Sequence, residues 1–340
     1  MQHEFADQIV VITGASAGIG RATARAFARK GAMVALIARD MDALAATRAE
    51  ILAGGGRAEV FALDVADASA VFTATEEIEA RCGPIDIWIN NAMATVFAPV
   101  AELSPDELRR VTEVTYLGTA HGTMAALHHM RQRNRGVIVQ VSSSLAYRGI
   151  PLQSAYCGAK HAARGFTDAL RSELLHDNSG VAITAVNLPA VNTPQFDWAR
   201  SKRRKLPRPV APVYAASAAA RAILQATRHP HREYWLGTST LLTIMGNMLA
   251  PRWLDGVLAR NAVTGQDREA LQPEGRPDNL YSPVTGIHRT DGPFGREARR
   301  HAMLYPAPVA RIGVVMLGAG IAAGLGGIAA TMIAAKNHRR

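Results

Sequence analysis

Tyr156 and Lys160 lie four residues apart in the stretch 154–160, and Ser143 lies thirteen residues before the tyrosine. Side chains at i and i+4 share one face of a helix, so the Lys160 ammonium can lie beside the Tyr156 phenol and favour its ionised form. A tyrosine with an unperturbed pKa near ~10 needs a pKa lower by ~3, or ~4 kcal/mol, to act as a base at neutral pH. These residues are a candidate proton-transfer site; the alternative is a solvated tyrosine and lysine on a surface helix.

A glycine-rich segment follows an apolar strand-like run and precedes a helical pattern. Its glycines are spaced Gly-x-x-x-Gly-x-Gly. Glycine permits a tight turn and close approach to phosphate, while the free N–H groups at the start of the next helix bind an anion. The flanking strand and helix supply the context that this motif needs. We predict that this turn binds the pyrophosphate of a dinucleotide, and the alternative is an ordinary strand-to-helix turn. The residues concerned are Gly14, Ser16, Gly18, Ile19 and Gly20.

A third motif is the apolar run 85–90, which continues into Asn91, Ala92 and Met93. In this order and at these spacings, the three motifs resemble those of the short-chain dehydrogenase/reductase family, over roughly residues 5–240. The resemblance implies that Tyr156 is the acid/base, that Ser143 binds and polarises the substrate oxygen, and that Lys160 lowers the tyrosine pKa and holds the nicotinamide ribose. It also implies a homo-oligomer.

Further cofactor contacts follow from the same resemblance. Asp64 in Leu63-Asp-Val65 is expected to face the adenine, and Asn90 is expected to lie along the cofactor. The stretch 189–193 matches the family segment that contacts the nicotinamide end. The cofactor-binding residues expected beyond the glycine-rich turn and the catalytic residues are Asp64, Val65, Asn90, Pro189, Val191 and Thr193.

The sequence departs from the family pattern at two positions. Met93 stands where the family usually has glycine, which adds a side chain beside the adenosine. Thr115 stands where the family usually has an asparagine that holds a relay water next to the lysine. Threonine can bond to a carbonyl or a water. We therefore expect a modified proton relay through Thr115, and an inactive site is the alternative.

The choice of cofactor depends on the end of the second strand-like run. Ala38 occupies the place where NAD-preferring relatives usually carry an acidic residue, and Arg39 follows at once. An acidic residue would repel a 2′-phosphate, whereas a guanidinium suits one. The sequence therefore predicts NADP(H), with NAD(H) as the second choice. In the alternative interpretation, Arg39 points to solvent and Asp40 caps the next helix.

The chain as a whole favours an α/β fold, a doubly wound, Rossmann-like parallel sheet in one domain over residues 1–240. Seven strand-like runs alternate with helical segments, as expected of βαβ units. Ser104 to Glu107 form a capping box, so a helix is predicted to begin there. His121, His128 and His129 lack an acidic or cysteine partner at ligand spacing, so no metal site is predicted. The seven runs are 8–13, 33–38, 58–62, 85–90, 136–141, 181–187 and 233–237.

Composition and charge limit the classes of protein to which this chain can belong. The chain has 340 residues, of which 48% are hydrophobic, and only two cysteines, which suits a catalytic domain in the reducing cytoplasm. The formal charge of +10 and the basic run 200–205 suggest nucleic-acid binding, but no aromatic-interleaved basic surface accompanies them. Nucleic acid is not predicted as a partner. The run is better read as a solvated substrate lid, or as a contact with anionic lipid or with an acidic substrate tail. Just before it, Phe196 and Trp198 are expected either to cover an apolar substrate or to pack in the core.

The C-terminal third differs from the family pattern. Residues 241–311 are predicted to be an extension and linker, because 266–310 are rich in proline, glycine and charge. Residues 312–335 are uncharged and mostly apolar, and their length is sufficient for one transmembrane helix. A membrane anchor is therefore expected, and a buried or disordered tail is the alternative.

Together these features predict an NADP(H)-dependent oxidoreductase that acts on the carbonyl or secondary alcohol of a small, apolar or lipid-like molecule. The alternative is a cofactor-bound scaffold or regulator with little turnover, suggested by Thr115 and by the tail.

Overall fold

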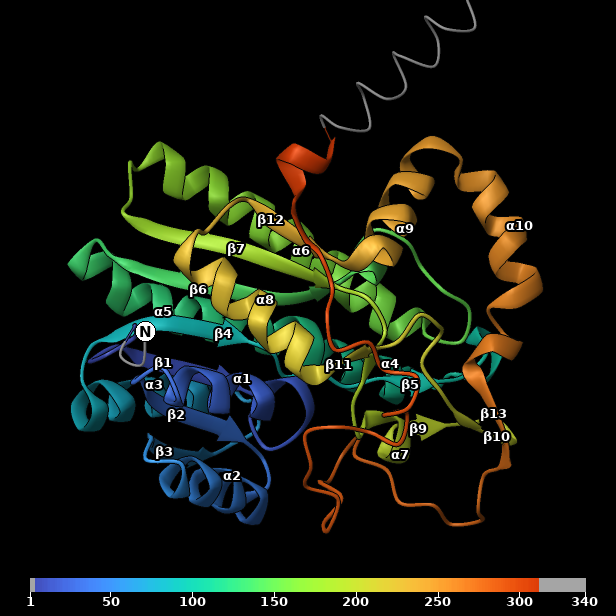
Figure 1. Ribbon diagram of the computed structural model, residues 1–340, viewed down its shortest axis with the longest axis horizontal. Coiled ribbons are helices and arrows are strands. Elements are labelled where there is room, and N and C mark those ends of the chain that lie inside the picture. The colour runs from blue at the N-terminus through green and yellow to red at the C-terminus, as the bar shows by residue number, and fades with distance from the viewer. Residues whose placement is uncertain (1–3, 312–340) are drawn as a thin grey trace, which may run out of the picture.

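Eight strands form one sheet at the centre of the computed structural model, which describes residues 4–311 (Figure 1). The strand order is β14-β12-β7-β6-β4-β1-β2-β3, and every neighbouring pair is parallel except β12 and β14. The chain reverses its direction of winding between β1 and β4, which is where this kind of sheet binds ligands. The strands are β1 (Ile9–Thr13), β2 (Met33–Ala38), β3 (Arg57–Ala62), β4 (Ile85–Asn90), β6 (Gly136–Ser143), β7 (Val181–Leu188), β12 (Glu233–Leu236) and β14 (Leu304–Pro306).

Helices cover both faces of the sheet because its buried strands are apolar on both sides. Along β1, Val10 and Ile12 pack into one core, and Ile9 and Val11 pack into the other. Successive strand residues point to opposite faces, so one strand supplies both cores. The first core packs against α1 (Gly18–Ala28), α2 (Met41–Ala53) and α8 (Ala216–Arg228). The second packs against α3 (Ala68–Cys82), α5 (Gly118–Arg133) and α6 (Ser154–His176).

The doubly wound fold predicted from the sequence is confirmed. All seven predicted strand runs correspond to strands of the central sheet, with ends that differ by at most two residues. The capping box is also present, since the Ser104 side chain and Glu107 each bond to the other's backbone N–H at the start of α4 (Pro105–Thr112). α4 continues into a π-helical turn, η2 (Glu113–Leu117), and then into α5.

Short elements fill the space around the carboxyl edge of the sheet. The strands are β5 (Val96–Phe97), β8 (Val191–Asn192), β9 (Arg200–Ser201), β10 (Lys205–Pro207), β11 (Tyr214–Ala215) and β13 (Asp267–Leu271), and the helices are η1 (Val100–Glu102), η3 (Ser144–Ala146), α7 (Gln195–Trp198), α9 (Gly237–Leu249), α10 (Pro251–Asn261) and η4 (Thr264–Gln266).

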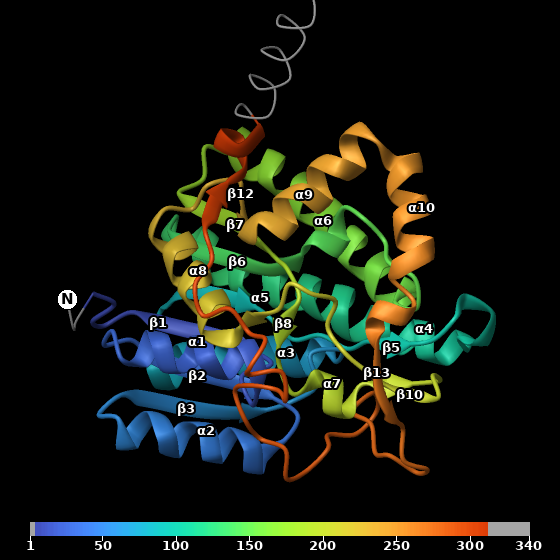
Figure 2. The same ribbon diagram turned by 45° about the vertical axis from the view of Figure 1, so that its right-hand side comes forward.

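Residues 241–311 are not the extended linker that their composition predicts. α9 and α10 form a helical hairpin, and β14 joins the central sheet by pairing with β12 (Figure 2). Between β13 and β14, the side chains of Leu280 and Phe294 are buried. The folded unit that contains the central sheet therefore extends well past residue 240. Scattered apolar anchors and backbone hydrogen bonds hold this part of the chain, and neither produces a periodic sequence pattern.

The predicted membrane segment, 312–335, lies outside the described residues. Among the helices of residues 4–311, none combines the length and the apolar character needed to cross a bilayer.

Candidate active site

A cavity of about 190 Å³ lies at the carboxyl ends of β1 to β4, where the winding of the sheet reverses. Every loop that was predicted to touch the cofactor's adenosine or pyrophosphate reaches it. The predicted residues that line it are Gly14, Ser16, Gly18, Ile19, Arg39, Asp64, Val65 and Thr193. We refer to this space as the nucleotide cavity.

Close contacts with neighbouring backbone atoms determine which residues fit in the glycine-rich turn. A Cβ on Gly20 would lie 2.1 Å from the carbonyl oxygen of Gly14, so only glycine fits at this place. Gly18 has φ of +57°, in the left-handed region that other residues avoid. Gly20 does not line the cavity itself, and its role is to let α1 begin close to β1.

Asp64, which was predicted to face the adenine, lines the nucleotide cavity and is held in place by two contacts. Its Oδ1 accepts a hydrogen bond of 3.0 Å from the backbone N–H of Ala66, and its Oδ2 pairs with Arg110 of α4. The Arg110 side chain is only 11% exposed. Arg110 could not be selected from the sequence, because it stands among other charged residues on an amphipathic helix.

Asn90, which was predicted to lie along the cofactor, does not line the nucleotide cavity. Its side chain is 3% exposed and points away from the cavity, where its Nδ2 donates to Thr123 and Gln140 and its Oδ1 accepts from the Trp88 indole. The next residue, Asn91, lines the nucleotide cavity instead, and its Nδ2 donates to the Thr13 carbonyl at 2.9 Å. Consecutive strand residues point to opposite sides, so only one of the two asparagines can face the cavity.

The structure contradicts the alternative interpretation of Arg39, in which this side chain points to solvent. Asp40 does cap α2, because its side chain accepts from the backbone N–H of Ala43. The Arg39 guanidinium does not point to solvent, since it donates to the carbonyls of Asn279, Leu280 and Tyr281. Burial lowers the Arg39 pKa, an effect that the nearby Asp64 opposes.

Ser143, Tyr156 and Lys160 meet in a second cavity of about 260 Å³. Ser143 ends β6 and Tyr156 lies in the first turn of α6, and both side chains line this cavity. Lys160 lies one turn later, with its Nζ 2.8 Å from the Val141 carbonyl and 5.7 Å from the centre of the Tyr156 ring. We call this space the substrate cavity. It shares Ile19, Asn91, Met93, Thr193 and Gln195 with the nucleotide cavity, so the two adjoin.

Burial shapes the protonation of this site. Desolvation, together with the neighbouring Cys157, raises the pKa of Tyr156, and the hydrogen bond with Ser143 partly offsets the rise. Desolvation also lowers the Lys160 pKa from 10.5 to about 8. The fold therefore keeps Tyr156 protonated, and an ionised phenol requires positive charge beside it.

Comparisons with known proteins agree with this geometry. The family model described as short chain dehydrogenase matches residues 8–204. The chain belongs to the short-chain dehydrogenase/reductase family. A relative in Bacillus subtilis, the uncharacterized oxidoreductase YxnA, is 32% identical over 284 residues, which cover 83% of this chain and 80% of YxnA.

Other members of the family match over shorter stretches. The human dehydrogenase/reductase SDR family member 7 is 37% identical over 175 residues, covering 50% of this chain and 52% of that protein. Among solved structures, an alcohol dehydrogenase from the archaeon Thermococcus sibiricus, complexed with 5-hydroxy-NADP, superposes with a TM-score of 0.57 at 28% identity, covering 66% of this chain and 91% of that one. A metagenomic short-chain oxidoreductase in complex with NADP gives 0.55 at 27% identity, covering 65% and 91%.

In this short-chain dehydrogenase, Thr115 lies in the π-helical turn and is fully buried. Its hydroxyl donates to the Ala94 carbonyl and accepts from the Ala94 N–H, both at 3.0 Å. Its carbonyl accepts from the Thr119 hydroxyl at 2.9 Å. The hydroxyl thus ties the turn to the loop after β4, and a relay through it would require one of these bonds to open.

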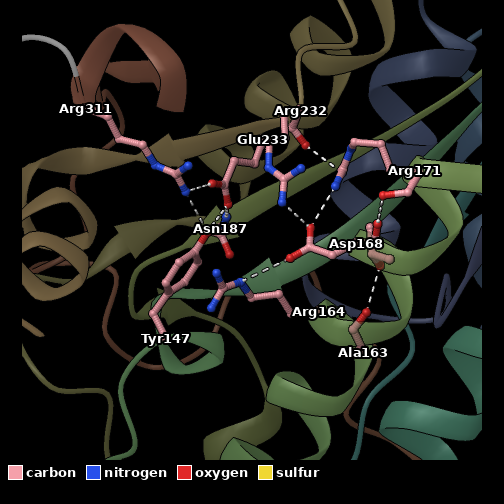
Figure 3. Close-up of polar contacts among 11 residues, drawn as sticks. Tyr147, Ala163, Arg164, Asp168, Arg171, Asn187, Arg232, Glu233 and Arg311 are labelled. Atoms are coloured by element: carbon pink, nitrogen blue, oxygen red, sulfur yellow. Dashed lines mark hydrogen bonds and ion pairs between the residues drawn. The ribbon is translucent and has the colours of Figure 1, made fainter. Parts of the chain in front are cut away.

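A smaller cavity, of about 20 Å³, lies on another side of Lys160, between β6, β7 and α6. Thr119, Gln140 and Asn187 line it together with Lys160, and its volume suits one water. Ionic residues that contact one another also line it (Figure 3). Asp168 pairs with Arg171 and Arg232 at 2.8 and 2.6 Å, and Glu233 pairs with Arg311.

Glu233 is a buried carboxylate that the sequence did not single out. It is 5% exposed and accepts from Asn187 at 3.0 Å and from the Tyr147 hydroxyl (Figure 3). Burial, and then the charge of Glu233, raises the Tyr147 pKa. Arg311 completes this group, so the last described residue ties the end of the domain to the region behind Lys160.

The substrate cavity is mostly apolar beyond the catalytic residues. Pro189 and Val191, both predicted, line it, and so does Phe196, whereas Trp198 lines the nucleotide cavity. Arg148 also reaches it, with its terminal nitrogens bonded to Asn247 and Asp255 and its Nε buried without a partner. The other apolar or basic lining residues include Leu145, Ile150, Leu188, Val210, Leu258 and Arg208.

The basic run 200–205 is largely engaged within the domain. Arg200 pairs with Asp278, Lys202 with Glu107, and Arg203 with Asp267. These contacts fasten the run to α4 and to the C-terminal region. A solvated lid is therefore the wrong description for most of it.

Proposed function

We propose that this protein transfers hydride between NADP(H) and the carbonyl or secondary alcohol of a small, largely apolar molecule, with Tyr156 as the acid/base. The observation that carries the proposal is that Ser143, Tyr156 and Lys160 line one cavity that adjoins the nucleotide cavity. A substrate oxygen placed between the two hydroxyls would lie within reach of both. When bound, the nicotinamide ring supplies the hydride donor or acceptor.

The side chains of the substrate cavity transfer the proton that accompanies the hydride. In reduction, the Tyr156 hydroxyl donates its proton to the substrate oxygen while the Ser143 hydroxyl holds that oxygen in place. The Lys160 ammonium lies beside the phenol and stabilises the phenolate that forms. In oxidation, the phenolate takes the proton from the alcohol. The 20 Å³ cavity next to Lys160 suits a water that exchanges protons with that ammonium.

Selectivity for NADP(H) over NAD(H) is supported by two features of the nucleotide cavity. β2 ends in the neutral Ala38, so no carboxylate at that position repels a 2′-phosphate. Arg39 adds a positive charge to the lining. NADP or its 5-hydroxy derivative is also the ligand in the two solved relatives described above. Titration of the protein with NADPH and NADH tests this preference, and equal affinities would contradict it.

The activity is tested with a panel of aldehydes, ketones and secondary alcohols of increasing apolar size. We expect NADPH oxidation with some carbonyls. Tyr156→Phe should lower turnover by ~10²–10⁴-fold while NADPH affinity is kept, because only the proton-transfer group is removed. Tyr305→Phe, on β14 and lining neither cavity, is the matched control. A protein that binds NADPH but turns over nothing across the panel would be a scaffold, the alternative that the sequence left open.

Attachment to a membrane through residues 312–335, with the catalytic domain in the cytoplasm, stays a sequence-based proposal. Fractionation of cells that make the full chain or a chain ending at Arg311 tests it. Recovery of both chains in the supernatant after high-speed centrifugation would contradict the anchor.

A further inference from the structure

One side of the nucleotide cavity is built from residues far along the chain. Asn279, Pro283, Val284 and His288 all line it, opposite the loops after β1, β2 and β3. We call residues 279–290 the C-terminal wall. Figures 1 and 2 both show this part of the chain, drawn in orange, crossing the region between α1 and α7. No motif in the sequence marks it.

The first end of the C-terminal wall is fastened through its backbone. Arg39 donates to the carbonyls of Asn279 and Tyr281, and Arg110 donates to the carbonyl of Leu280 at 3.0 Å. The Leu280 side chain is fully buried in the core that lies beneath the cavity. The Arg39 guanidinium, which was predicted from the sequence to bind the cofactor, therefore binds the segment that forms one side of the nucleotide cavity.

The second end is fastened to the glycine-rich turn. The backbone N–H of Gly18 donates to the carbonyl of Arg289 at 3.1 Å, and the Arg21 guanidinium donates to the carbonyl of His288 at 2.7 Å. The Arg21 side chain is 4% exposed and is paired with Glu50, so it is a rigid support. Between the two ends, Ser282 to Gly286 are mostly exposed.

We propose that the C-terminal wall is part of the adenine-nucleotide binding site, and that Arg39 acts mainly as a positioning residue that holds this wall. The proposal rests on the proposed function, because its ligand is the adenosine half of a nicotinamide dinucleotide. Arg39 lines the cavity and bonds to three wall carbonyls, so its effect on binding reaches the cofactor through the wall.

The proposal separates two roles of Arg39 that predict different results. A residue that serves only a 2′-phosphate affects NADPH and leaves NADH unchanged, since NADH lacks that group. A residue that holds the wall affects both cofactors, because they share the adenosine and pyrophosphate. Loss of the wall also removes contacts that slow release, so both dissociation rates should rise.

Arg39→Ala in the full chain is the first test. We expect the affinity for NADH to fall by about tenfold, the affinity for NADPH to fall by at least as much because a positive charge is also lost, and both dissociation rates to rise, because bonds from a charged donor to three carbonyls are lost. Fluorescence titration and stopped-flow displacement measure these values. Arg48→Ala is the matched control, because Arg48 also donates to a backbone carbonyl, that of Ala58, but lies away from the cavity.

Leu280→Ala tests the wall without touching Arg39 or the cavity, since Leu280 does not line it. It should weaken both cofactors in the same proportion. Leu174→Ala is the control, because Leu174 is buried in the same core away from the site. If Leu280→Ala does not fold, Gly286→Val replaces it: Gly286 is exposed with φ of +82°, so a β-branched side chain strains the wall alone.

Hydrogen exchange of the unaltered protein gives an independent result. Saturation with NADPH, or with 2′,5′-ADP as the adenosine half alone, should slow amide exchange in residues 281–290. Unchanged exchange there would overturn the proposal, and so would an Arg39→Ala variant that loses NADPH affinity only. If the unaltered protein binds neither cofactor, the proposed function itself fails. If it binds and reduces carbonyls while both wall variants bind normally, only the wall assignment fails.

Discussion

Replacing the buried Lys160 by methionine should make the stability of this protein less dependent on pH. Lys160 is 4% exposed, and burial lowers its pKa from 10.5 to about 8. Between these values, the unfolded chain still binds the lysine proton while the folded protein has released it. Stability of the unaltered protein therefore rises with pH across this window, and below it the full cost of burying the ammonium is present.

The size of the effect follows from the two pKa values. Each pKa unit corresponds to ~1.36 kcal/mol, so the difference amounts to about 3 kcal/mol. Lys160→Met has no proton to release and lacks this rise. It also loses the bond to the Val141 carbonyl, which costs about 1 kcal/mol at every pH and does not alter the slope. The stability advantage of Lys160→Met should hence shrink by about 3 kcal/mol as the pH is raised from about 7 to about 10.5.

Urea unfolding of cofactor-free protein across this pH range measures the difference. Lys205→Met is the matched control, since Lys205 is exposed and its replacement removes no burial cost. Stability curves for Lys160→Met and the unaltered protein that run parallel over the whole range would refute the reasoning, whatever the absolute stabilities are.

Two further changes test the packing around the site. Gly20→Ala would place a methyl group 2.1 Å from the Gly14 carbonyl, so we expect thermal unfolding at a lower temperature and NADPH affinity at least about tenfold weaker. Gly158→Ala on α6 meets nothing within 4 Å and should be neutral or stabilising by ~0.5–1 kcal/mol. Glu233→Ala should cost about 3 kcal/mol in urea unfolding, because it leaves the buried Tyr147 hydroxyl and Asn187 amide without their acceptor, and a loss near zero would mean that water replaces the missing carboxylate.

The strands of the central sheet were predictable from the sequence, because each forms a largely apolar run. Apolar runs such as 9–13 and 85–90 became strands because a strand buried on both faces needs apolar residues throughout. The catalytic side chains were predictable for a related reason. Tyr156 and Lys160 lie on one helix, so their spacing alone sets them on one face.

The misplaced residues depend on information that spacing does not carry. Choosing Asn91 over Asn90 requires knowing which side of β4 faces the cavity, and two adjacent polar residues leave that open. Arg39 has a side chain long enough to reach the cofactor or the C-terminal wall, and its partners lie about 240 positions away in the chain. Single buried residues such as Leu280 anchor the C-terminal wall, so no periodic sequence pattern predicts it.

The pairing of β14 with β12 has a consequence for how copies of this protein can associate. β12 has a hydrogen-bonded neighbour on each side, so it offers no free backbone edge to a second chain. β14 therefore forms the edge of the sheet. It has only three residues, and its last residue, Pro306, lacks an N–H. At the opposite edge, β3 carries Arg57 and Glu59. Association by continuing the sheet from one subunit into the next is disfavoured at both edges, and a homo-oligomer would be built through its helices.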